Sequence, residues 1–400
     1  MSKVNLTEIC NITTGKLDSN AAEENGKYPY FTCAPEPLAI NTYAFDDDVI
    51  LLAGNNASGN FHCQRYKGKF NAYQRTYVIT AKDGYDIDYI YYNLKINLAH
   101  LKKIAQGSQT KFLTMQILDG FKLEDVGLEE QKRLSKILSK IDDKIELNNK
   151  INVELESMAK TLYDYWFLQF EFPNEEGKPY KSSGGKMVWN EELKREIPEG
   201  WEVDTVKKCI CHINTGLNPR DNFKLGNGHI KYITVKNLTI NGTIDFSGCD
   251  QIDEDARKIV HKRSDVSKGD ILFASIAPLG RCVIVQENPK DWDINESVFC
   301  IRPNLNKVST EFLYMFFMSE YFVKKAEHSS TGSVFYGIRI STLEEMLILI
   351  PPKAIKDKLT DIVKDIFVKK NQNEKENQEL ASLRDFLLPL LMNGQVRFKE

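Results

Sequence analysis

The sequence predicts an α+β protein with two globular domains, each followed by one long helix. Three observations lead to this prediction. The chain repeats itself, two segments show an uninterrupted helical pattern of apolar residues, and the rest alternates short apolar runs with turn-forming residues. The 400 residues, of which 42% are hydrophobic and 27% charged, exceed what one ordinary core needs.

An internal duplication is visible in two places. Residues 10–16, CNITTGK, match residues 211–217, CHINTGL, at four of seven positions and at an offset of 201. Residues 134–162 match residues 359–387 at 11 of 29 positions and at an offset of 225. The second copy therefore carries 24 additional residues early in its globular part.

The two globular domains are expected to span residues 1–125 and 201–350. In both, runs rich in apolar and β-branched residues are separated by Gly, Asn and Asp, as strands are by turns. The expected strands are 48–53, 76–80, 269–274, 282–285 and 347–350, and helical stretches are expected near 86–105 and 309–328.

The first long helix is expected over residues 126–170. Apolar residues recur there in steps of three and four, and no Pro or Gly occurs between Leu128 and Phe172. The following segment, 171–200, is rich in Gly, Pro and Ser and reads as a polar connector between the two halves.

The second long helix is expected over residues 351–392. Pro351-Pro352 suit its first turn, and Pro389 is expected to end the regular helix after about Leu388. About 35 helical residues span roughly 50 Å, and the narrow apolar stripe is typical of a coiled coil.

Near the middle both apolar stripes turn polar, at Lys144 and Asn148 and at the matching Lys369 and Asn373. A buried Asn in a helix seam would fix the register of the two helices. A solvated edge of the helix pair would explain the same residues, so both interpretations stay open at this point.

No catalytic constellation is found in the sequence. It lacks a cofactor-binding Gly-rich loop, a Walker loop, and zinc-protease and serine-hydrolase motifs. Cys209-x-Cys211-His212 has no second pair of zinc ligands and is interpreted as part of a buried strand. The acidic runs 46–48 and 253–255 are interpreted as solvated turns. The sequence therefore predicts a protein that binds and does not catalyse.

The formal net charge is −3, which is unusual for a nucleic-acid reader because phosphate contacts come from basic surfaces. We therefore expect uneven charge, or a partner that supplies part of the basic surface. No apolar run of eighteen residues and no signal-peptide core is found, so no membrane partner and a cytoplasmic location are expected. The eight cysteines are expected to be reduced.

Several motifs resemble the specificity subunits of type I restriction-modification enzymes. They are LSKIDDKIELNNKIN at 138–152, LYDYWF at 162–167, GGKMVW at 184–189, IPEGW at 197–201 and LLPLLMNG at 387–394. The resemblance covers both repeats and is weakest in the globular domains. It implies two target recognition domains separated by two long antiparallel coiled-coil helices, with an internal pseudo-two-fold repeat and with helix length acting as a ruler.

The resemblance also implies a division of labour. This chain would read a bipartite double-stranded DNA target, one recognition domain per half-site, and would hold two modification (methyltransferase) subunits and restriction subunits. S-adenosylmethionine, ATP and Mg²⁺ would be bound by those partner subunits. The chain itself would bind no cofactor and no metal and would not be an enzyme.

Base reading needs side chains with paired hydrogen-bonding groups on loops that a rigid scaffold holds. In the first domain we expect DNA contacts from Lys16, Asn55, Asn56, Ser58, Arg75, Gln109 and Lys111. The loop 332–337 of the second domain corresponds to the loop that contains Gly107. In that domain we expect contacts from Arg220, Lys236, Asn237, Arg281, Ser333, Tyr336 and Arg339.

Other functions stay open at this stage. A specificity subunit of a stand-alone methyltransferase, or of another bipartite modification system, would have the same features. A coiled-coil scaffold whose globular ends bind proteins would explain the helices but not the duplicated loops. An acidic DNA mimic is disfavoured because 53 basic residues balance the 56 acidic ones.

Overall fold

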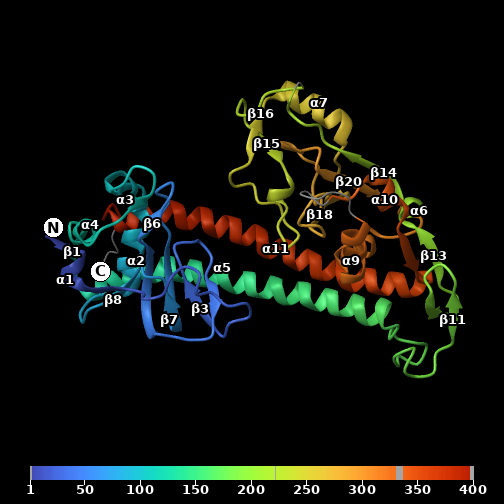
Figure 1. Cartoon of the computed structure of the whole chain (residues 1–400), viewed down its shortest axis with the longest axis horizontal. Helices are drawn as coiled ribbons and strands as arrows, with labels where there is room; N and C mark the ends of the chain where they lie inside the picture. Colours follow the sequence, from blue (N-terminus) through green and yellow to red (C-terminus); the bar gives the residue numbers. More distant parts are fainter. Residues whose placement is uncertain (1, 221, 330–336, 397–400) are drawn as a thin grey trace. The chain divides into compact units, whose positions relative to one another are not determined.

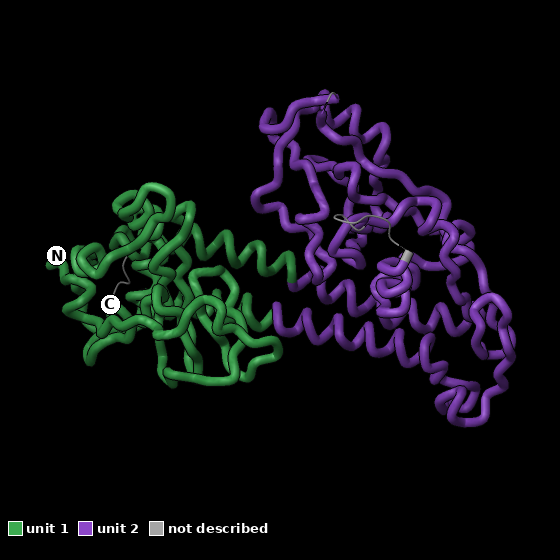
Figure 2. The backbone as a smooth tube through the Cα atoms, in the orientation of Figure 1, with its two compact units in different colours: residues 1–148, 374–400 green, residues 149–373 purple. Residues whose placement is uncertain are grey.

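The computed structural model describes residues 2–220, 222–329 and 337–396. The chain divides into two compact units, one of residues 1–148 with 374–400 and the other of residues 149–373 (Figure 2). Both boundaries fall inside the long helices. Each unit therefore combines one globular domain with half of each helix, whereas the sequence predicts domains and helices as separate segments.

Unit 1 is built on a six-stranded sheet in the order β2-β8-β5-β7-β3-β4, in which the β3–β7 pairing is parallel and the others are antiparallel. The strands are β1 (Lys3–Asn5), β2 (Cys10–Thr14), β3 (Tyr28–Phe31), β4 (Leu38–Ile40), β5 (Phe45–Ala53), β6 (Asn55–Asn56), β7 (Cys63–Ala72), β8 (Thr76–Ala81), β9 (Lys111–Phe112) and β10 (Lys122–Glu124). The short helices are α1 (Leu6–Ile9), α2 (Ile87–Ile96), α3 (Leu98–Ile104) and α4 (Met115–Asp119) (Figure 1).

The sheet of unit 1 packs on both faces because consecutive residues of β5 are apolar. Ile50 belongs to the core cluster that includes α2, whereas Val49 belongs to a second cluster around Phe70. The α2 cluster also takes in Leu138 and Leu388 from the two long helices. The globular domain is therefore fixed to the helix pair by a continuous apolar core.

Unit 2 contains a four-stranded sheet in the order β14-β20-β17-β18 and a three-stranded sheet in the order β16-β15-β19. Its strands are β11 (Met187–Asn190), β12 (Arg195–Pro198), β13 (Glu202–Thr205), β14 (Ile210–Thr215), β15 (Ile230–Ile233), β16 (Asp250–Ile252), β17 (Ile271–Ala274), β18 (Cys282–Ile284), β19 (Trp292–Ile294), β20 (Val298–Pro303) and β21 (Leu347–Ile350). Its helices are α6 (Val206–Cys209), the 3-10 helix η2 (Val235–Asn237), α7 (Glu254–Ser264), α8 (Thr310–Met318), α9 (Glu320–Ser329) and α10 (Ile340–Glu345).

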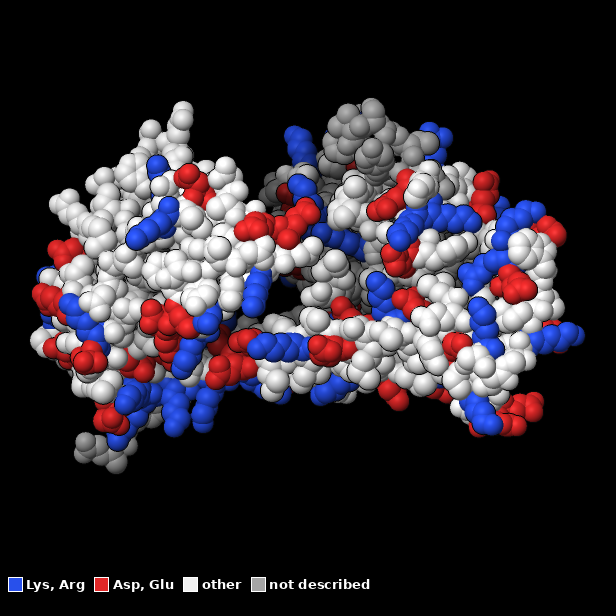
Figure 3. All heavy atoms as spheres, turned by 60° about the horizontal axis from the view of Figure 1, so that its bottom comes forward, with Lys and Arg blue, Asp and Glu red and all other residues white. Residues whose placement is uncertain are grey.

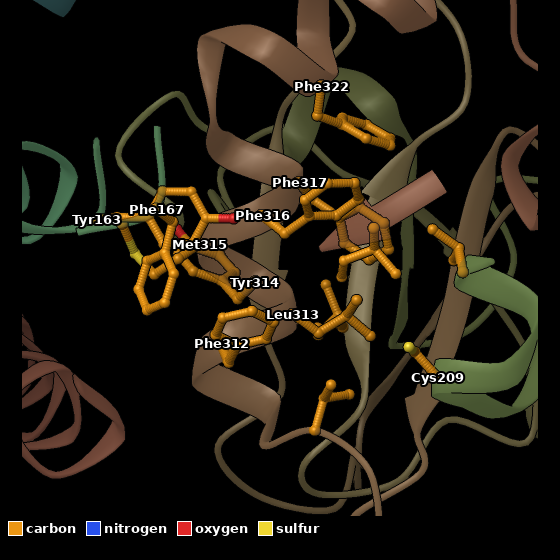
Figure 4. Close-up of a cluster of buried hydrophobic side chains, with 14 of the residues drawn as sticks. Tyr163, Phe167, Cys209, Phe312, Leu313, Tyr314, Met315, Phe316, Phe317 and Phe322 are labelled. Atoms are coloured by element: carbon orange, nitrogen blue, oxygen red, sulfur yellow. The ribbon is translucent and has the colours of Figure 1, made fainter. Parts of the chain in front are cut away.

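Aromatic side chains dominate the core of unit 2 (Figure 4). Phe312 of α8 meets Phe167 edge to face at a centroid distance of 5.4 Å, and Phe317 meets Phe322 of α9 at 5.0 Å. Edge-to-face pairs add to the apolar burial that these rings already provide. The expected helix near 309–328 is confirmed as α8 and α9.

The connector between the two halves, residues 171–200, is mostly exposed but contains ordered structure. β11 and β12 form a hairpin, and Phe172 stacks on Tyr180 at a centroid distance of 4.5 Å and lies 5.0 Å from Trp201. A few apolar residues among many polar ones supply this packing. A composition-based reading gives them too little weight.

The duplication is visible in the order of elements. The succession β1–α1–β2 in unit 1 corresponds to β13–α6–β14 in unit 2, and β1 pairs with β10 as β13 pairs with β21. Gly15 and Gly216 share a steric requirement, since a Cβ atom on either would lie under 2 Å from a backbone oxygen of the facing strand. The Thr-Gly identity in the duplicated motif therefore reflects a close backbone approach.

The first long helix, α5 (Leu128–Tyr163), continues into a π-helical turn, η1 (Asp164–Leu168). The second, α11 (Lys353–Met392), runs past Pro389, where the sequence predicts its end. Leu391 and Met392, beyond Pro389, are buried in the core of unit 1, and this burial offsets the helical hydrogen bond that Pro389 cannot donate. Tertiary packing thus outweighs the local preference.

The helices pack antiparallel within each unit, and the two asparagines in the polar middle of the stripe are buried. Asn148 and Asn373 are each 1% exposed, which excludes the solvated-edge interpretation for them. Lys144 and Lys369 are exposed, so that interpretation holds for the lysines. Asn148 Nδ2 donates to Asn377 Oδ1 at 2.9 Å in unit 1, and Asn373 Nδ2 donates to Asn152 Oδ1 at 2.8 Å in unit 2. The offset of 225 residues converts the first pair into the second, so the seam follows the internal repeat.

Candidate nucleic-acid interface

Two predicted loops of unit 1 are joined by a short strand pairing. β6 pairs antiparallel with β9, so that Asn55 lies opposite Phe112 and Asn56 opposite Lys111. Gln109 is exposed in the tight turn that precedes β9. The structure thus brings together residues that lie more than fifty positions apart in the sequence.

The side chain of Asn56 folds the first loop back on itself. Asn56 Oδ1 accepts hydrogen bonds from the N–H groups of Ser58 (2.9 Å) and Asn60 (3.0 Å). Lys102 Nζ of α3 donates to Asn60 Oδ1 at 2.6 Å. Lys102 is not among the predicted contact residues, although its neighbour Lys103 makes a basic pair that the sequence shows.

The other two candidates of unit 1 lie on adjoining turns. The N–H of Gly54, directly before Asn55, donates to the carbonyl of Arg75 at 2.8 Å. Lys16 follows β2, where the N–H of Gln74 donates to the carbonyl of Leu17 at 2.9 Å. The side chains of Lys16 and Arg75 are exposed. All seven candidates of the first domain therefore share one edge of the unit.

A buried tyrosine holds the turn after the duplicated motif in each unit. The Tyr30 hydroxyl donates to the carbonyl of Asp18, and the Tyr232 hydroxyl donates to the carbonyl of Leu217. Burial, and secondarily Asp18, raises the pKa of Tyr30 to about 12, so its hydroxyl remains a donor at neutral pH. Each tyrosine follows the Thr-Gly dipeptide by 15 or 16 residues, a spacing that the sequence displays but that our predictions did not use.

In unit 2, Lys236 is exposed at the start of a small hairpin formed by residues 237–245. Asn237 is 8% exposed, and its amide is already used. Asn237 Oδ1 accepts from the N–H of Thr234 (2.9 Å), and Nδ2 donates to the carbonyl of Asp245 (3.1 Å). This placement corrects the prediction for Asn237, because a buried amide that closes the hairpin is not available to a base edge.

Arg281 is half-buried and braces the same hairpin, because its Nη1 donates to the carbonyl of Leu238 at 3.1 Å. Gly337 forms a bridge with Ile276, in the loop that leads to Arg281. Arg339 is exposed two residues further on, directly before α10. The structure therefore places the segment of Arg339 beside that of Arg281.

Three candidates of unit 2 remain, and the structure describes only one of them. Arg220 is exposed in the loop that follows β14, four residues beyond Gly216, whose N–H donates to the carbonyl of Asn295 at 3.1 Å. Ser333 and Tyr336 lie outside the described residues, so their assignment stays a prediction.

Charge is mixed on the face that Figure 3 shows, where basic and acidic side chains alternate over both units. On this face the basic side chains form no continuous surface. This agrees with the net charge of −3 and limits the electrostatic attraction that the chain can exert on DNA.

The two acidic runs are largely exposed, as the sequence predicts, but neither forms a turn. Residues 46–48 lie in β5, where Asp48 pairs with Arg65 at 2.7 Å, and Arg65 also pairs with Asp88 at 2.6 Å. These groups line a polar cleft of about 610 Å³ bordered by α2 and α5. Asp253 caps α7 by accepting from the N–H of Ala256 at 2.8 Å.

The cysteines are free thiols, and the buried-strand interpretation holds for neither member of the CxC pair. Cys209 is buried at the end of α6, whereas Cys211 is exposed on β14. Within the residues that the structure describes, no group of three or more His, Cys, Asp or Glu side chains is arranged to hold a metal ion. Over the same residues, no helix is both long and apolar enough to cross a bilayer.

Comparison with known proteins gives a consistent result. A family model described as type I restriction modification DNA specificity domain matches residues 1–157 and 198–382. The MjaIX specificity subunit of Methanocaldococcus jannaschii is 31% identical over 80% of this chain and 72% of its own length. The EcoDI specificity subunit of Escherichia coli is 27% identical over 97% of this chain and 86% of its own length.

A solved structure shares the fold. The crystal structure of the S subunit of a type I restriction-modification system from M. genitalium superposes with a TM-score of 0.55, at 18% identity, over 98% of this chain and 96% of that one. The family match, together with the duplicated domains and the helix seam, assigns the chain to the DNA-recognition subunits of such systems. The chain belongs to the family of type I restriction-modification specificity subunits. It acts with DNA and with other subunits of such a system.

Proposed function

We propose that the globular domain of each unit reads one half of a bipartite double-stranded DNA target, and that the helix pair sets the distance between the two half-sites. The observation that carries this proposal is the presence, in both repeats, of exposed cationic loops after the equivalent strands β2 and β14. Half-sites one helical turn apart are separated by about 34 Å. A helix of 36 residues spans roughly 50 Å and is long enough to serve as the ruler.

Specific roles follow from the chemistry of the side chains. Asn55 and Gln109 offer the paired donor and acceptor that match adenine, whereas Lys16, Arg75 and Lys111 match guanine or phosphate. In unit 2 the corresponding contacts come from Arg220, Lys236 and Arg339, together with Ser333 and Tyr336. Asn56 and Ser58 shape the first loop, and Arg281 braces the hairpin of the second domain.

The partners are two modification (methyltransferase) subunits and restriction subunits, and the complex works in the cytoplasm. The internal repeat supports a pair of modification subunits, because a pseudo-two-fold molecule presents two related docking surfaces. S-adenosylmethionine, ATP and Mg²⁺ are bound by those partners.

The test is to co-express the chain with its modification partner and to map modified bases in the host genome. The wild-type chain is expected to give a two-part motif with an unspecific spacer. Lys111→Ala is expected to weaken recognition of one half-site and Arg339→Ala of the other, each by about 10- to 100-fold, which corresponds to loss of one good base contact.

Lys69→Ala serves as the matched control for Lys111→Ala. Lys69 is an exposed lysine of the same domain, opposite Asp46 at the far end of β5 from Asn55. It is expected to leave both half-sites unchanged. A single undivided motif for the wild type, or unchanged half-sites in both loop variants, would contradict the proposal.

A further inference from the structure

A buried lysine of the helix seam contacts the recognition hairpin of unit 2. Lys370 of α11 has a side chain only 6% exposed, and its ammonium group forms an ion pair with Glu156 of α5. The same Nζ donates to the backbone carbonyl of Asn241. A buried ammonium needs compensation on more than one side, and here the compensation comes from a helix and from the globular domain.

Asn241 lies at the tip of the hairpin of residues 237–245. The tip is closed by hydrogen bonds from the N–H of Thr239 to the carbonyl of Thr243 (2.9 Å) and from the N–H of Gly242 to the carbonyl of Thr239 (3.2 Å). Gly242 has a φ of +66°, and a Cβ atom there would lie 2.3 Å from the Tyr314 hydroxyl. The tip is therefore held tightly between α8 and α11.

The base of the same hairpin carries the predicted DNA contacts. Lys236 directly precedes it, and Arg281 donates to the carbonyl of Leu238 within it. Leu238 in turn bridges Ile244 across the hairpin. A continuous set of contacts thus leads from the ion pair of the helices to the base of the hairpin, which Lys236 directly precedes.

Unit 1 has no matching device at the equivalent positions. The offset of 225 residues relates Lys370 to Ile145 and Glu156 to Ala381, both apolar. One ion pair between the helices of unit 1, formed by Arg384 and Asp142, meets the globular domain through Tyr92 of α2. Tyr92 is a buried core residue of α2 and belongs to neither of the predicted DNA-contact loops.

We propose that Lys370 is a positioning residue for recognition of one half-site: it locks the hairpin of residues 237–245 to the helix pair and so fixes the placement of Lys236. The inference rests on the proposed function. It assigns to a buried residue of the helices an effect on sequence recognition by the second domain only.

The experiment compares Lys370→Met with a control variant, Asn373→Leu. Asn373 is also a buried polar residue of the seam, but its side chain bonds Asn152 of the other helix and not the recognition domain. Hydrogen exchange of the full chain tests the lock without DNA. Exchange rates are compared after correction for the global stability of each variant. The Gly242 amide is expected to exchange about tenfold faster in Lys370→Met and at the wild-type rate in Asn373→Leu. Equal exchange in both variants would overturn the inference.

The same variants, co-expressed with the modification partner, test the effect on recognition. Lys236→Ala identifies the half-site that the second domain reads. Lys370→Met is expected to lower sequence discrimination at that half-site by about tenfold and to leave the other half-site unchanged. Lys370→Arg keeps the charge and is expected to restore discrimination, and Glu156→Gln is expected to act on the same half-site.

A general weakening of the helix pair would lower discrimination equally at both half-sites, and that result would contradict the inference. A wild-type chain without a two-part motif instead sinks the proposed function, while the exchange measurement still decides whether Lys370 holds the hairpin.

Discussion

Asp293 of unit 2 is fully buried, and its carboxylate is shared by two side chains of α7. It accepts hydrogen bonds from Ser264 Oγ at 2.6 Å and from the N–H of Ile294 at 2.8 Å, and it lies 2.9 Å from Nδ1 of His261. A Ser, a His and an Asp thus meet in one cluster. The arrangement is structural, because Ser264 and His261 both bond the carboxylate, whereas in a catalytic triad the Ser bonds the His.

This cluster predicts a pH-dependent contribution to stability. The bond with Asp293, more than the opposing burial and the nearby Arg257, raises the pKa of His261 above 6.5. A raised folded-state pKa means that the contribution is complete below about 6.5 and is lost as the pH rises through the folded-state value. In urea unfolding of the full chain, the difference between wild type and His261→Gln is expected to shrink from pH 6 to pH 8. A constant or growing difference would contradict this assignment.

Single polar residues were the hardest to assign from the sequence. Asn55 and Asn237 both sit after an apolar run, yet the first lies at a partly exposed loop and the second is buried with its amide used. The difference depends on Asp245 and Thr234, and on how the chain between them folds back. Lys102 was missed for the same reason, since its partner Asn60 is 42 residues away.

At the scale of elements, the asparagine pairs of the helix seam carry a testable energy. Replacement of Asn373 by Leu leaves Asn152 Oδ1 buried without its donor, which is expected to cost about 1–3 kcal/mol. The double variant Asn152→Leu/Asn373→Leu replaces both partners by apolar groups and is expected to be less destabilised than the sum of the single variants. A double-mutant cycle in urea measures the coupling, and strictly additive costs would refute it.

The long helices were predictable because a periodic apolar stripe over 30 residues leaves few alternatives. The strands within 48–53, 76–80, 271–274 and 347–350 were predictable for a similar reason, as short apolar runs between turns. The connector hairpin and the last turn of α11 were not, because burial of Phe172 and Met392 depends on surfaces distant in the sequence. Local residue preferences predict the secondary structure of a segment, but packing against distant parts of the chain overrides them here.

At the scale of the whole molecule, near balance between 53 basic and 56 acidic residues predicts weak binding to DNA by the chain alone. Three cationic candidates in each domain would contribute at most about 0.9 each to the slope of log K against log salt, or roughly 5 in total. Titrations of a labelled duplex at several salt concentrations measure that slope. It is expected to steepen when the modification partner is added. Tight binding by the isolated chain that ignores salt would contradict the prediction.

The duplication itself was visible in the sequence, whereas the way the repeats have diverged was not. In unit 1 a partly buried ion pair joins Asp142 of α5 to Arg384 of α11, whereas in unit 2 an ion pair joins Glu156 and Lys370 of the same two helices. The repeat equivalents of all four residues are uncharged. No alignment of the repeats could reveal these pairs, because each exists in one copy only.

This divergence limits how the gene can be recombined. If two copies of the first repeat were combined into one protein, Asp142 would face Ala159 where Arg384 now stands, and a half-buried carboxylate would lose its counterion. A recognition domain can be exchanged between relatives without loss of these ion pairs only if α5 and α11 continue to come from the same protein. When the second recognition domain is exchanged, the new hairpin must also place a backbone carbonyl where Lys370 can donate to it.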